Sequence, residues 1–393
     1  MSRFLIVAPA HESWGEFLHA RQFAQELRAR GHEVAFLVST PMTTLLEGLG
    51  FKVGTLGLGP IDDAIVTAAS SFRPDLIVLA DAYVVFMNLA KHNRHHSFAT
   101  RLDKIAALDV WDLTRTGLSW DLGDVQWKIP PEALAFERRL VPVPFAIADS
   151  AAFAALPEAS GRDPRVGRAR CNVGDDQRML LITTASWQRE TFQWLGPQRR
   201  SARTLPAWIG SVFASLPESF VVVHIGPERW PFGALEERYR WLPQCQPDVF
   251  REIMSGADVH VTTNLVARSI GEALRAAVPI VLAQSSMSFI TADDPRVQDE
   301  SLRTWLRAAA PVQPFRVWPY GLSKFLEPHT RGNPYIETLR IVEVFDAAGF
   351  REACIELASP STARDAVLAA GARYVAAVDR LPLAAQRLEQ WAA

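Results

Sequence analysis

Cysteine is scarce in this chain of 393 residues, with only Cys171, Cys245 and Cys354 and no CxxC spacing. Three scattered cysteines exclude a disulfide framework and a cysteine zinc site, so we expect a reducing, cytoplasmic compartment. The first residues lack the pattern of a cleavable signal peptide. No window approaches the roughly 18 apolar residues that a membrane-spanning helix needs, so we expect no membrane span.

An excess of charge of one sign is also lacking. Lys and Arg number 41 against 43 Asp and Glu, a formal net charge of −2. Proteins that bind nucleic acid or anionic membranes usually carry a basic face, so we expect no nucleic-acid partner. No G-x-G-x-x-G turn follows the first apolar run, whose loop holds only Gly15. This absence excludes a nicotinamide-dependent dehydrogenase.

What the chain does have is an alternation of short apolar runs with segments of helical spacing. Continuous runs such as Phe4 to Ala8 (FLIVA) are typical of parallel strands covered on both faces. The runs predict strands at 4–8, 32–40, 51–56, 76–80, 104–110, 141–150, 178–185, 219–226, 258–263 and 279–284. The spacing predicts helices at 17–31, 42–50, 205–216, 249–257 and 269–277, and over almost all residues from Pro334 onward.

The strand–helix alternation begins twice, on either side of a stretch rich in Gly, Pro and charge. We therefore predict an α/β protein with two facing Rossmann-like, doubly wound domains and a helical C-terminal tail. The expected boundaries are 1–160 for the first domain, 161–176 for the linker, 177–350 for the second domain and 351–393 for a tail that packs across both domains. Ligands of such sheets bind at the carboxyl ends of the strands, so a cleft between the domains is the expected site.

The most specific pattern lies between Arg240 and Gln284. It consists of W-x-P-Q (Trp241 to Gln244), a strand that ends in Thr-Thr-Asn, and then S-x-x-E-x-x-x-x-A-V-P starting at Ser269. This order resembles the family 1 glycosyltransferases (UDP-glycosyltransferases) and the related family 28 enzymes that add N-acetylglucosamine to a cell-wall lipid. The resemblance implies the two-domain GT-B fold. Two departures are clear: the chain has Thr263 or Asn264 in place of a phosphate-binding His, and Ala277 in place of Gly.

The resemblance assigns roles to this segment as a sugar-nucleotide site. It implies that Trp241 stacks on uracil and that Glu272 binds the ribose, while Gln244 reads the edge of the base. A diphosphate is favoured by a helix N-terminus and by small or hydroxyl side chains. The residues expected at the diphosphate are Ser186, Thr263, Asn264, Arg268 and Ser269.

The loop after the first strand resembles the acceptor side of the same families, where a Gly-His pair supplies the general base. Here Gly15-Glu16 occupies that pair, and His11 lies nearby. An inverting transfer needs a base near the acceptor and a stabilised leaving diphosphate, with no covalent intermediate. We expect His11 as the first candidate for the base and Glu16 as the second. Asp109 follows a strand and is expected to orient the base or contact the acceptor.

The sequence therefore predicts a metal-independent, inverting glycosyltransferase with an acceptor-binding first domain and a nucleotide-sugar-binding second domain. The expected co-substrate is a UDP or dTDP sugar, with no bound cofactor, and the expected acceptor is a small molecule such as a natural-product aglycone. Two alternatives stay open. One is a GT-B-shaped auxiliary protein without catalysis, which the missing His-Gly turn favours; the other is a sugar-nucleotide 2-epimerase. The oligomeric state is open as well, a homodimer included.

Overall fold

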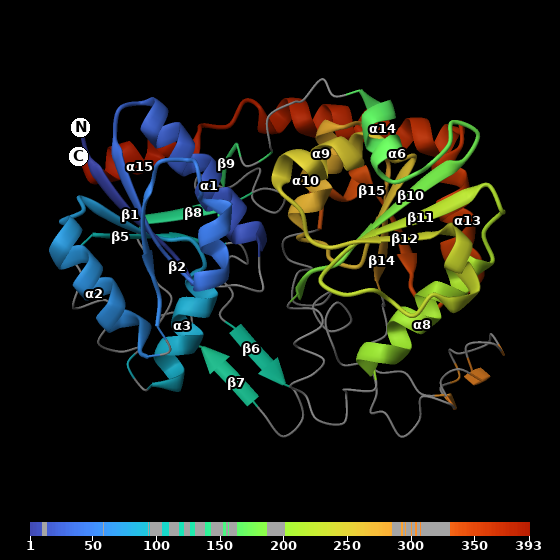
Figure 1. The fold of residues 1–393 in the computed structure, drawn as a ribbon, viewed down its shortest axis with the longest axis horizontal. Helices are drawn as coiled ribbons and strands as arrows, with labels where there is room; N and C mark the ends of the chain where they lie inside the picture. The colour runs from blue at the N-terminus through green and yellow to red at the C-terminus, as the bar shows by residue number, and fades with distance from the viewer. Residues whose placement is uncertain are drawn as a thin grey trace. The chain divides into compact units, whose positions relative to one another are not determined.

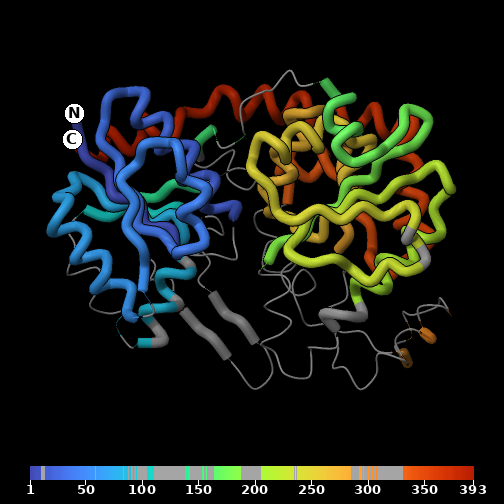
Figure 2. The backbone as a smooth tube through the Cα atoms, viewed as in Figure 1, coloured from blue at the N-terminus to red at the C-terminus, as the bar shows by residue number. Residues whose placement is uncertain are grey.

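A computed structural model describes residues 1–9, 14–57, 59–92, 94, 104–109, 118–121, 126–129, 138–142, 152–154, 156, 163–186, 201–284, 292–293, 295, 300, 303–304, 307 and 331–393. The chain divides into two compact units (Figure 1). Unit 1 comprises Met1–Ala155 and Ala377–Ala393, and unit 2 comprises Leu156–Ala376. The chain therefore starts and ends in unit 1, where both termini are marked (Figure 2).

Unit 1 is built on a parallel sheet of seven strands in the order β3-β2-β1-β4-β5-β8-β9. A separate antiparallel pair is formed by β6 and β7. The elements are β1 (Arg3–Ala8), α1 (Trp14–Ala29), β2 (Glu33–Val38), the 3-10 helix η1 (Thr40–Leu45), β3 (Lys52–Thr55), α2 (Ile61–Phe72), β4 (Leu76–Leu79), α3 (Ala82–Lys91), β5 (Ile105–Leu108), β6 (Leu118–Asp121), β7 (Gln126–Ile129), β8 (Arg138–Pro142), β9 (Ala152–Phe153) and α15 (Ala384–Ala392).

Unit 2 is built on a parallel sheet of six strands in the order β12-β11-β10-β13-β14-β15. The elements are α6 (Pro164–Arg170), β10 (Arg178–Thr183), α8 (Ser201–Ala214), β11 (Phe220–Ile225), η4 (Gly233–Arg238), β12 (Tyr239–Leu242), α9 (Pro247–Ser255), β13 (Val259–Thr262), α10 (Arg268–Arg275), β14 (Ile280–Gln284), η5 (Ile336–Thr338), β15 (Leu339–Glu343), α13 (Ala347–Ala358) and α14 (Thr362–Val378), which ends at the start of the second stretch of unit 1.

The central strands of both sheets are buried on both faces. Every residue of β4, β5, β11 and β13 is buried, and successive side chains of a strand point to opposite faces. A continuous apolar run is therefore the pattern that a doubly covered strand requires. The predicted α/β class with two doubly wound sheets is confirmed.

Two of the predicted elements are wrong. Residues 42–50 were expected to form a helix, but a 3-10 helix ends at Leu45 and turns follow, with Gly48 and Gly50 at φ 74° and 68°. Those left-handed conformations suit glycine and cannot continue a helix. The helical pattern expected from Pro334 onward is interrupted by β15, which pairs with β14. This strand has exposed residues at its centre, since it lies at the edge of the sheet.

The range expected to be a linker, 161–176, contains helix α6. Asp163 caps this helix by accepting a hydrogen bond from the backbone N–H of Arg165. The helix packs against α9, and Gly167 lies so close to the backbone of Glu252 that a Cβ there would be 2.0 Å from the carbonyl oxygen. Close packing of two helices therefore occupies this stretch within unit 2.

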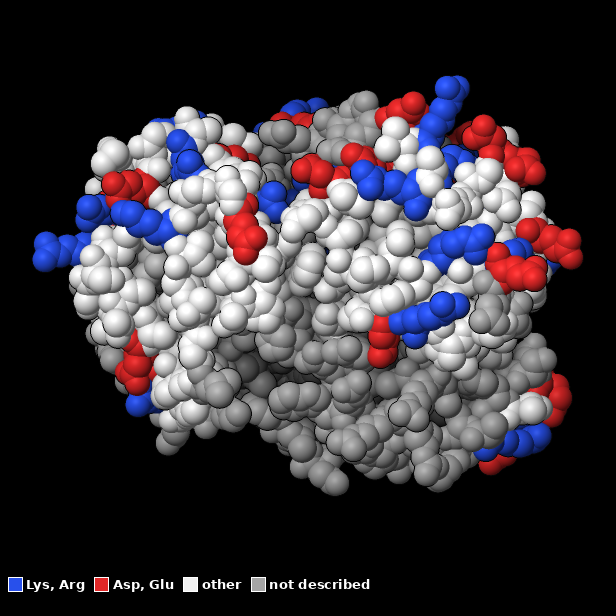
Figure 3. Space-filling view, in the orientation of Figure 1, with Lys and Arg blue, Asp and Glu red and all other residues white. Residues whose placement is uncertain are grey.

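The surface carries charges of both signs. Figure 3 shows Lys and Arg interspersed with Asp and Glu over the described part of the viewed face. Among the described helices, none is both long and apolar enough to cross a membrane.

Candidate functional site

Each sheet has one point at which the strand order reverses. In unit 1 the chain builds β1-β2-β3 outward in one direction and then starts again beside β1 with β4. In unit 2 it builds β10-β11-β12 and then starts again beside β10 with β13. Loops diverge at such a switch point, and doubly wound sheets bind ligands there, at the carboxyl ends of the strands.

In unit 2, three side chains are linked at the switch point itself. Thr183 ends β10, and its Oγ1 lies 3.0 Å from His260 Nε2 in the neighbouring strand β13. The same oxygen lies 3.0 Å from Ser269 Oγ in the first turn of α10. The His260 side chain is fully buried, and burial lowers its pKa to about 3. The ring is therefore neutral, and a neutral network joins the two strands to the helix N-terminus.

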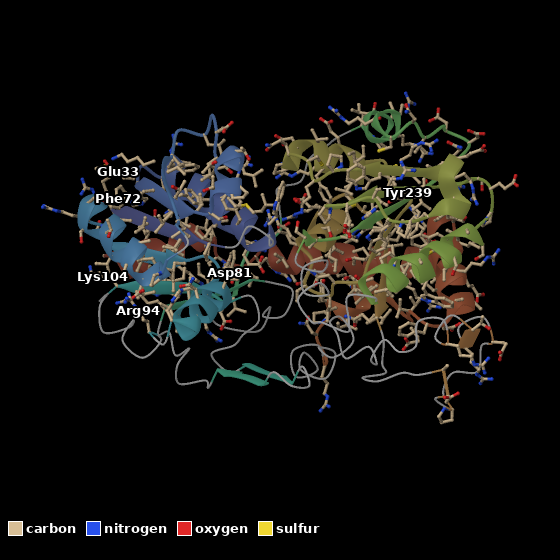
Figure 4. All side chains as sticks on the ribbon, turned by 60° about the horizontal axis from the view of Figure 1, so that its bottom comes forward. Glu33, Phe72, Asp81, Arg94, Lys104 and Tyr239 are labelled. Carbon is tan, nitrogen blue, oxygen red and sulfur yellow. The ribbon has the colours of Figure 1, made fainter. Side chains whose placement is uncertain are left out.

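A second network joins the residue after β10 to His224 near the end of β11 and to Tyr239 at the start of β12. Thr184 Oγ1 lies 2.8 Å from His224 Nε2, and His224 Nδ1 lies 2.7 Å from the hydroxyl of Tyr239 (labelled in Figure 4). That hydroxyl also accepts a hydrogen bond from the backbone N–H of Trp230. Burial lowers the pKa of His224 to about 3 and raises the pKa of Tyr239 to about 12, so both groups are neutral.

Trp241, the residue predicted to stack on the base, is held by this part of the sheet. Its Nε1 donates a hydrogen bond of 3.1 Å to the carbonyl oxygen of Gly226, just beyond the end of β11. A Cβ at Gly226 would lie 2.1 Å from Thr184 Oγ1 and 2.5 Å from His224 Nε2. The lack of a side chain at residue 226 thus allows the second network and the tryptophan to share one short stretch of backbone.

The turn between β13 and α10 contains the residues that replace the family's His-Gly turn. The N–H of Asn264 donates to Thr262 Oγ1, and Asn264 Oδ1 accepts from the N–H of Val266. Short polar side chains stabilise tight turns in this way. Thr263 is buried in this turn. Helix α10 then starts at Arg268 without a side-chain cap at Ala267, which leaves its N-terminus suited to an anion.

Glu272, the predicted ribose ligand, is buried on α10. Its Oε2 lies 3.3 Å from Nε of Arg251 on α9. An arginine beside a buried carboxylate stabilises its charged form. Of the other expected donor residues, Ser186 lies buried just past β10 and Gln244 follows β12. Of the expected donor residues, Trp241 lies in β12, while Ser186, Gln244, Thr263 and Asn264 follow β10, β12 and β13. Arg268, Ser269 and Glu272 lie on α10.

In unit 1 the switch point carries two acidic residues. Glu16 lies in the first turn of α1, after β1, and Asp81 follows β4, the strand paired with β1 (Figure 4 labels Asp81). Asp81 is buried, and its Oδ1 accepts a hydrogen bond from the N–H of Val84 at the start of α3. Burial, followed by the negative charge of Asp81, raises the pKa of Glu16 to about 8. A carboxyl group with such a pKa exchanges a proton near neutral pH.

Asp109 follows β5, the next strand in the sheet, and is buried. Its Oδ2 lies 3.6 Å from Arg139 Nη1 on β8. The acidic residues after β1, β4 and β5 therefore follow three neighbouring strands at one edge of the sheet. His11, our first candidate for the base, lies outside the described residues. Within the described part of the chain, no group of three or more His, Cys, Asp or Glu side chains is arranged to hold a metal ion.

Local sequence pattern did not single out Asp81, Thr183, His224, Tyr239 and His260, which belong to these networks. Asp81 had a usable signal, since it follows a strand just as Asp109 does. The two histidines had a weaker signal: His224 is the single polar residue of the run FVVVHI, and His260 lies between two valines of β13. Their partners lie on other strands, which no local pattern identifies.

Comparison with known proteins places the chain in a family. A family model described as a family of unknown function (DUF6365) matches residues 23–393. The chain belongs to this family. A search of curated proteins finds no match by sequence.

Solved structures resemble the chain over nearly its whole length. The spinosyn rhamnosyltransferase SpnG matches with a TM-score of 0.55 and 12% identity, covering 99% of each chain. A putative UDP-N-acetylglucosamine 2-epimerase from Listeria monocytogenes matches with a TM-score of 0.54 and 12% identity, covering 97% of this chain and 95% of the other. The calicheamicin glycosyltransferase CalG4 matches with a TM-score of 0.52 and 15% identity, covering 100% and 98%. These likenesses show that the DUF6365 chain has the GT-B fold, as predicted.

Proposed function

We propose that this DUF6365 protein transfers a sugar from a nucleoside diphosphate donor to the hydroxyl of a small-molecule acceptor. One observation carries the proposal. At the switch point of unit 2, the hydroxyl groups of Thr183 and Ser269 lie 3.0 Å apart at the uncapped N-terminus of α10, and Trp241 lies in the outer strand β12. Hydroxyl donors and a helix N-terminus suit a diphosphate, and an aromatic ring suits a base. The fold supports this reading, since one structure of SpnG is a complex with thymidine diphosphate.

The proposed donor contacts follow from this arrangement. The diphosphate lies at Ser269 and the N–H groups that start α10, and the base lies on Trp241, whose ring is oriented by its hydrogen bond to Gly226. Glu272 lies on α10 beyond these N–H groups, and we propose that it takes the ribose hydroxyls while Arg251 holds its carboxylate. The preferred base is uracil or thymine, because the resemblance of the W-x-P-Q segment points to UDP or dTDP sugars.

The proposed general base is Glu16. Its carboxylate accepts the proton of the acceptor hydroxyl while the acceptor oxygen forms a bond to the anomeric carbon of the sugar. The bond from that carbon to the diphosphate oxygen breaks, and the diphosphate leaves with the electron pair. A pKa of about 8 matches a base to a proton transfer near neutral pH better than an ordinary carboxyl group does. Asp81 supports this role, because its charge helps to raise that pKa.

Calorimetric titration with UDP, dTDP, GDP and their sugar conjugates tests the donor site. We expect micromolar binding of one nucleotide, with a loss of about fivefold to 100-fold in Trp241→Ala, the range for loss of a base-stacking ring. Gln246→Ala is the matched control, since Gln246 is exposed in the same segment and should leave binding unchanged. Failure of the wild-type protein to bind any nucleotide would contradict the proposal and favour a non-catalytic GT-B protein.

Release of the nucleoside diphosphate in a panel of aglycones tests the base. Glu16→Gln should lower kcat by about 100-fold to 10,000-fold, the usual contribution of a general base, with unchanged nucleotide affinity. The wild-type rate should rise with pH up to about 8, because the deprotonated carboxylate is the active form. The same fold includes a putative 2-epimerase, so UDP-N-acetylglucosamine without acceptor is a necessary arm. Conversion of UDP-N-acetylglucosamine to its 2-epimer in that sample would show that the protein is an epimerase and not a transferase.

A further inference from the structure

Two histidines interrupt the apolar strands on either side of β10, and both are fully buried. His224 lies in β11 and His260 in β13, the two strands that pair with β10. Each faces a threonine hydroxyl at the end of β10, Thr184 for His224 and Thr183 for His260. A buried neutral imidazole has one donor and one acceptor nitrogen, so its tautomer sets which way each hydroxyl hydrogen bond runs. The direction can be derived from the partners.

For His224 the direction is set by Tyr239. The tyrosine oxygen accepts a hydrogen bond from the Trp230 N–H, and His224 Nδ1 is its only acceptor within the described residues. A buried phenol that did not donate would leave its proton unpaired, which is costly. Tyr239 therefore donates to Nδ1, and the proton of the imidazole is on Nε2. That nitrogen donates to Thr184 Oγ1, so the hydroxyl proton of Thr184 points to a further acceptor.

For His260 the direction is set by the nitrogen on the other side of the ring. Nδ1 has no hydrogen-bond partner in the described part of the chain and is buried. A buried N–H donor without a partner is rarer than an acceptor without one, so Nδ1 is the unprotonated nitrogen. The proton is then on Nε2, which donates to Thr183 Oγ1, and Thr183 donates to Ser269 Oγ. The hydroxyl proton of Ser269 is in turn available to a further acceptor.

We propose that His224 and His260 are positioning residues that make Thr184 and Ser269 hydrogen-bond donors to the diphosphate of the sugar nucleotide. This inference rests on the proposed function, and it adds the buried residues that decide the polarity of the site. Both relays run from the sheet interior toward the carboxyl ends of the strands, and one ends in the first turn of α10. Phosphate oxygens only accept hydrogen bonds, so two hydroxyls directed in this sense suit a diphosphate. With the opposite histidine tautomers, the hydroxyl oxygens of Thr184 and Ser269 would direct lone pairs at the diphosphate and repel it.

The tautomers can be measured in the free protein, without any ligand. Long-range proton–nitrogen NMR correlations on histidine-labelled protein distinguish the protonated from the unprotonated ring nitrogen. We expect Nε2–H for both His224 and His260, with His224→Gln and His260→Gln spectra giving the assignments. Observation of Nδ1–H at either ring in the wild-type protein would overturn the corresponding relay.

Binding variants test the consequence for the diphosphate. Titrations compare the nucleoside diphosphate that binds the wild-type protein with its parent nucleoside. Ser269→Ala should weaken the diphosphate about tenfold or more, and Tyr239→Phe about threefold to tenfold, with nucleoside affinity unchanged. Thr184→Val should match the loss in Ser269→Ala, whereas Thr184→Ser should restore binding because it keeps the donor.

The double variant of Thr183→Val with Ser269→Ala separates a relay from independent contacts. Because Thr183 acts through Ser269, the double variant should bind no more weakly than Ser269→Ala alone. Equal losses of nucleoside and diphosphate affinity, or unchanged diphosphate affinity in Tyr239→Phe and Thr183→Val, would overturn this inference while the proposed function stood. A wild-type protein that binds no nucleotide would instead overturn the proposed function itself.

Discussion

At the scale of single residues, the candidate sites depend on ionisable groups held in the neutral state. Burial keeps His224 and His260 uncharged, and burial with a neighbouring negative charge keeps much of Glu16 protonated near neutral pH. Glu16, the proposed general base, owes its pKa of about 8 to burial and to the negative charge of Asp81. The environment of a carboxyl group can therefore move its pKa into the range in which a general base works near neutral pH.

The raised pKa of Glu16 predicts a pH-dependent stability. The folded protein binds this proton up to about pH 8, whereas the unfolded chain releases it near its ordinary pKa of 4.5. The protonated Glu16 side chain therefore contributes fully to the free energy of unfolding below about pH 4.5, and this contribution is lost as pH rises to about 8. Over this range the free energy of unfolding falls by at most about 1.4 kcal/mol per pH unit. Urea unfolding at a series of pH values should show this slope in the wild-type protein and not in Glu16→Gln. The exposed Glu47→Gln variant should keep it, and an unchanged slope in Glu16→Gln would refute the assignment.

At the scale of elements, helix α6 shows how a segment rich in Gly, Pro and charge becomes ordered. Pro164 starts the helix, the carboxylate of Asp163 caps it, and Gly167 allows it to lie directly on α9. Arg168 then donates hydrogen bonds to the carbonyl of Gly256 and to Asp258, so the helix is also tied to the loop before β13. The polar composition here serves helix ends and close packing, not a flexible connection.

Gly167→Ala should therefore destabilise unit 2. The added methyl group would meet the Glu252 carbonyl at 2.0 Å, and because the obstacle is backbone the two helices must separate. We expect a loss of about 1–3 kcal/mol, the usual range for overpacking. Gly233→Ala is the control, since nothing lies within 4 Å of the added Cβ. Equal midpoints of urea unfolding for the two variants would contradict this packing.

At the scale of the whole molecule, the chain leaves unit 1 once and returns to it. The last helix, α15, packs on α1 and β4 of unit 1. Glu389 on this helix accepts hydrogen bonds from Arg30 at 2.6 and 2.7 Å and lies 2.7 Å from His32 Nε2. The hydrogen bond from Arg30 lowers the pKa of Glu389 to about 2. The fold of unit 1 therefore depends on residues from both ends of the chain.

Leu388→Ala should destabilise unit 1 and leave unit 2 protected. Leu388 is fully buried on α15, and truncation of such a leucine costs about 2–5 kcal/mol. Hydrogen–deuterium exchange should speed up in β1, β4 and α1 and stay unchanged in β10, β11 and β13. Leu383→Ala is the control at the start of the same helix, because Leu383 is 37% exposed. Faster exchange spread equally over both sheets would show that the two units unfold together.

Local sequence patterns are enough to predict the class of fold and most of its elements. Continuous apolar runs specify doubly covered strands, so β1, β4, β10 and β13 were predictable from local pattern. The W-x-P-Q and S-x-x-E segments pointed to the GT-B fold. Local pattern failed at β15, whose exposed edge lacks the apolar run of a central strand.

Which side chains meet depends on the order in which the strands assemble. The negative charge of Asp81 acts on Glu16 because β4, which precedes Asp81, pairs with β1, which precedes Glu16. The pKa of Glu16 therefore depends on that pairing. His224 and His260 find their hydroxyl partners across strands whose order is not written in any local pattern. Periodicity records which face of an element is buried, whereas strand order, burial and the resulting proton positions arise only when the sheets assemble.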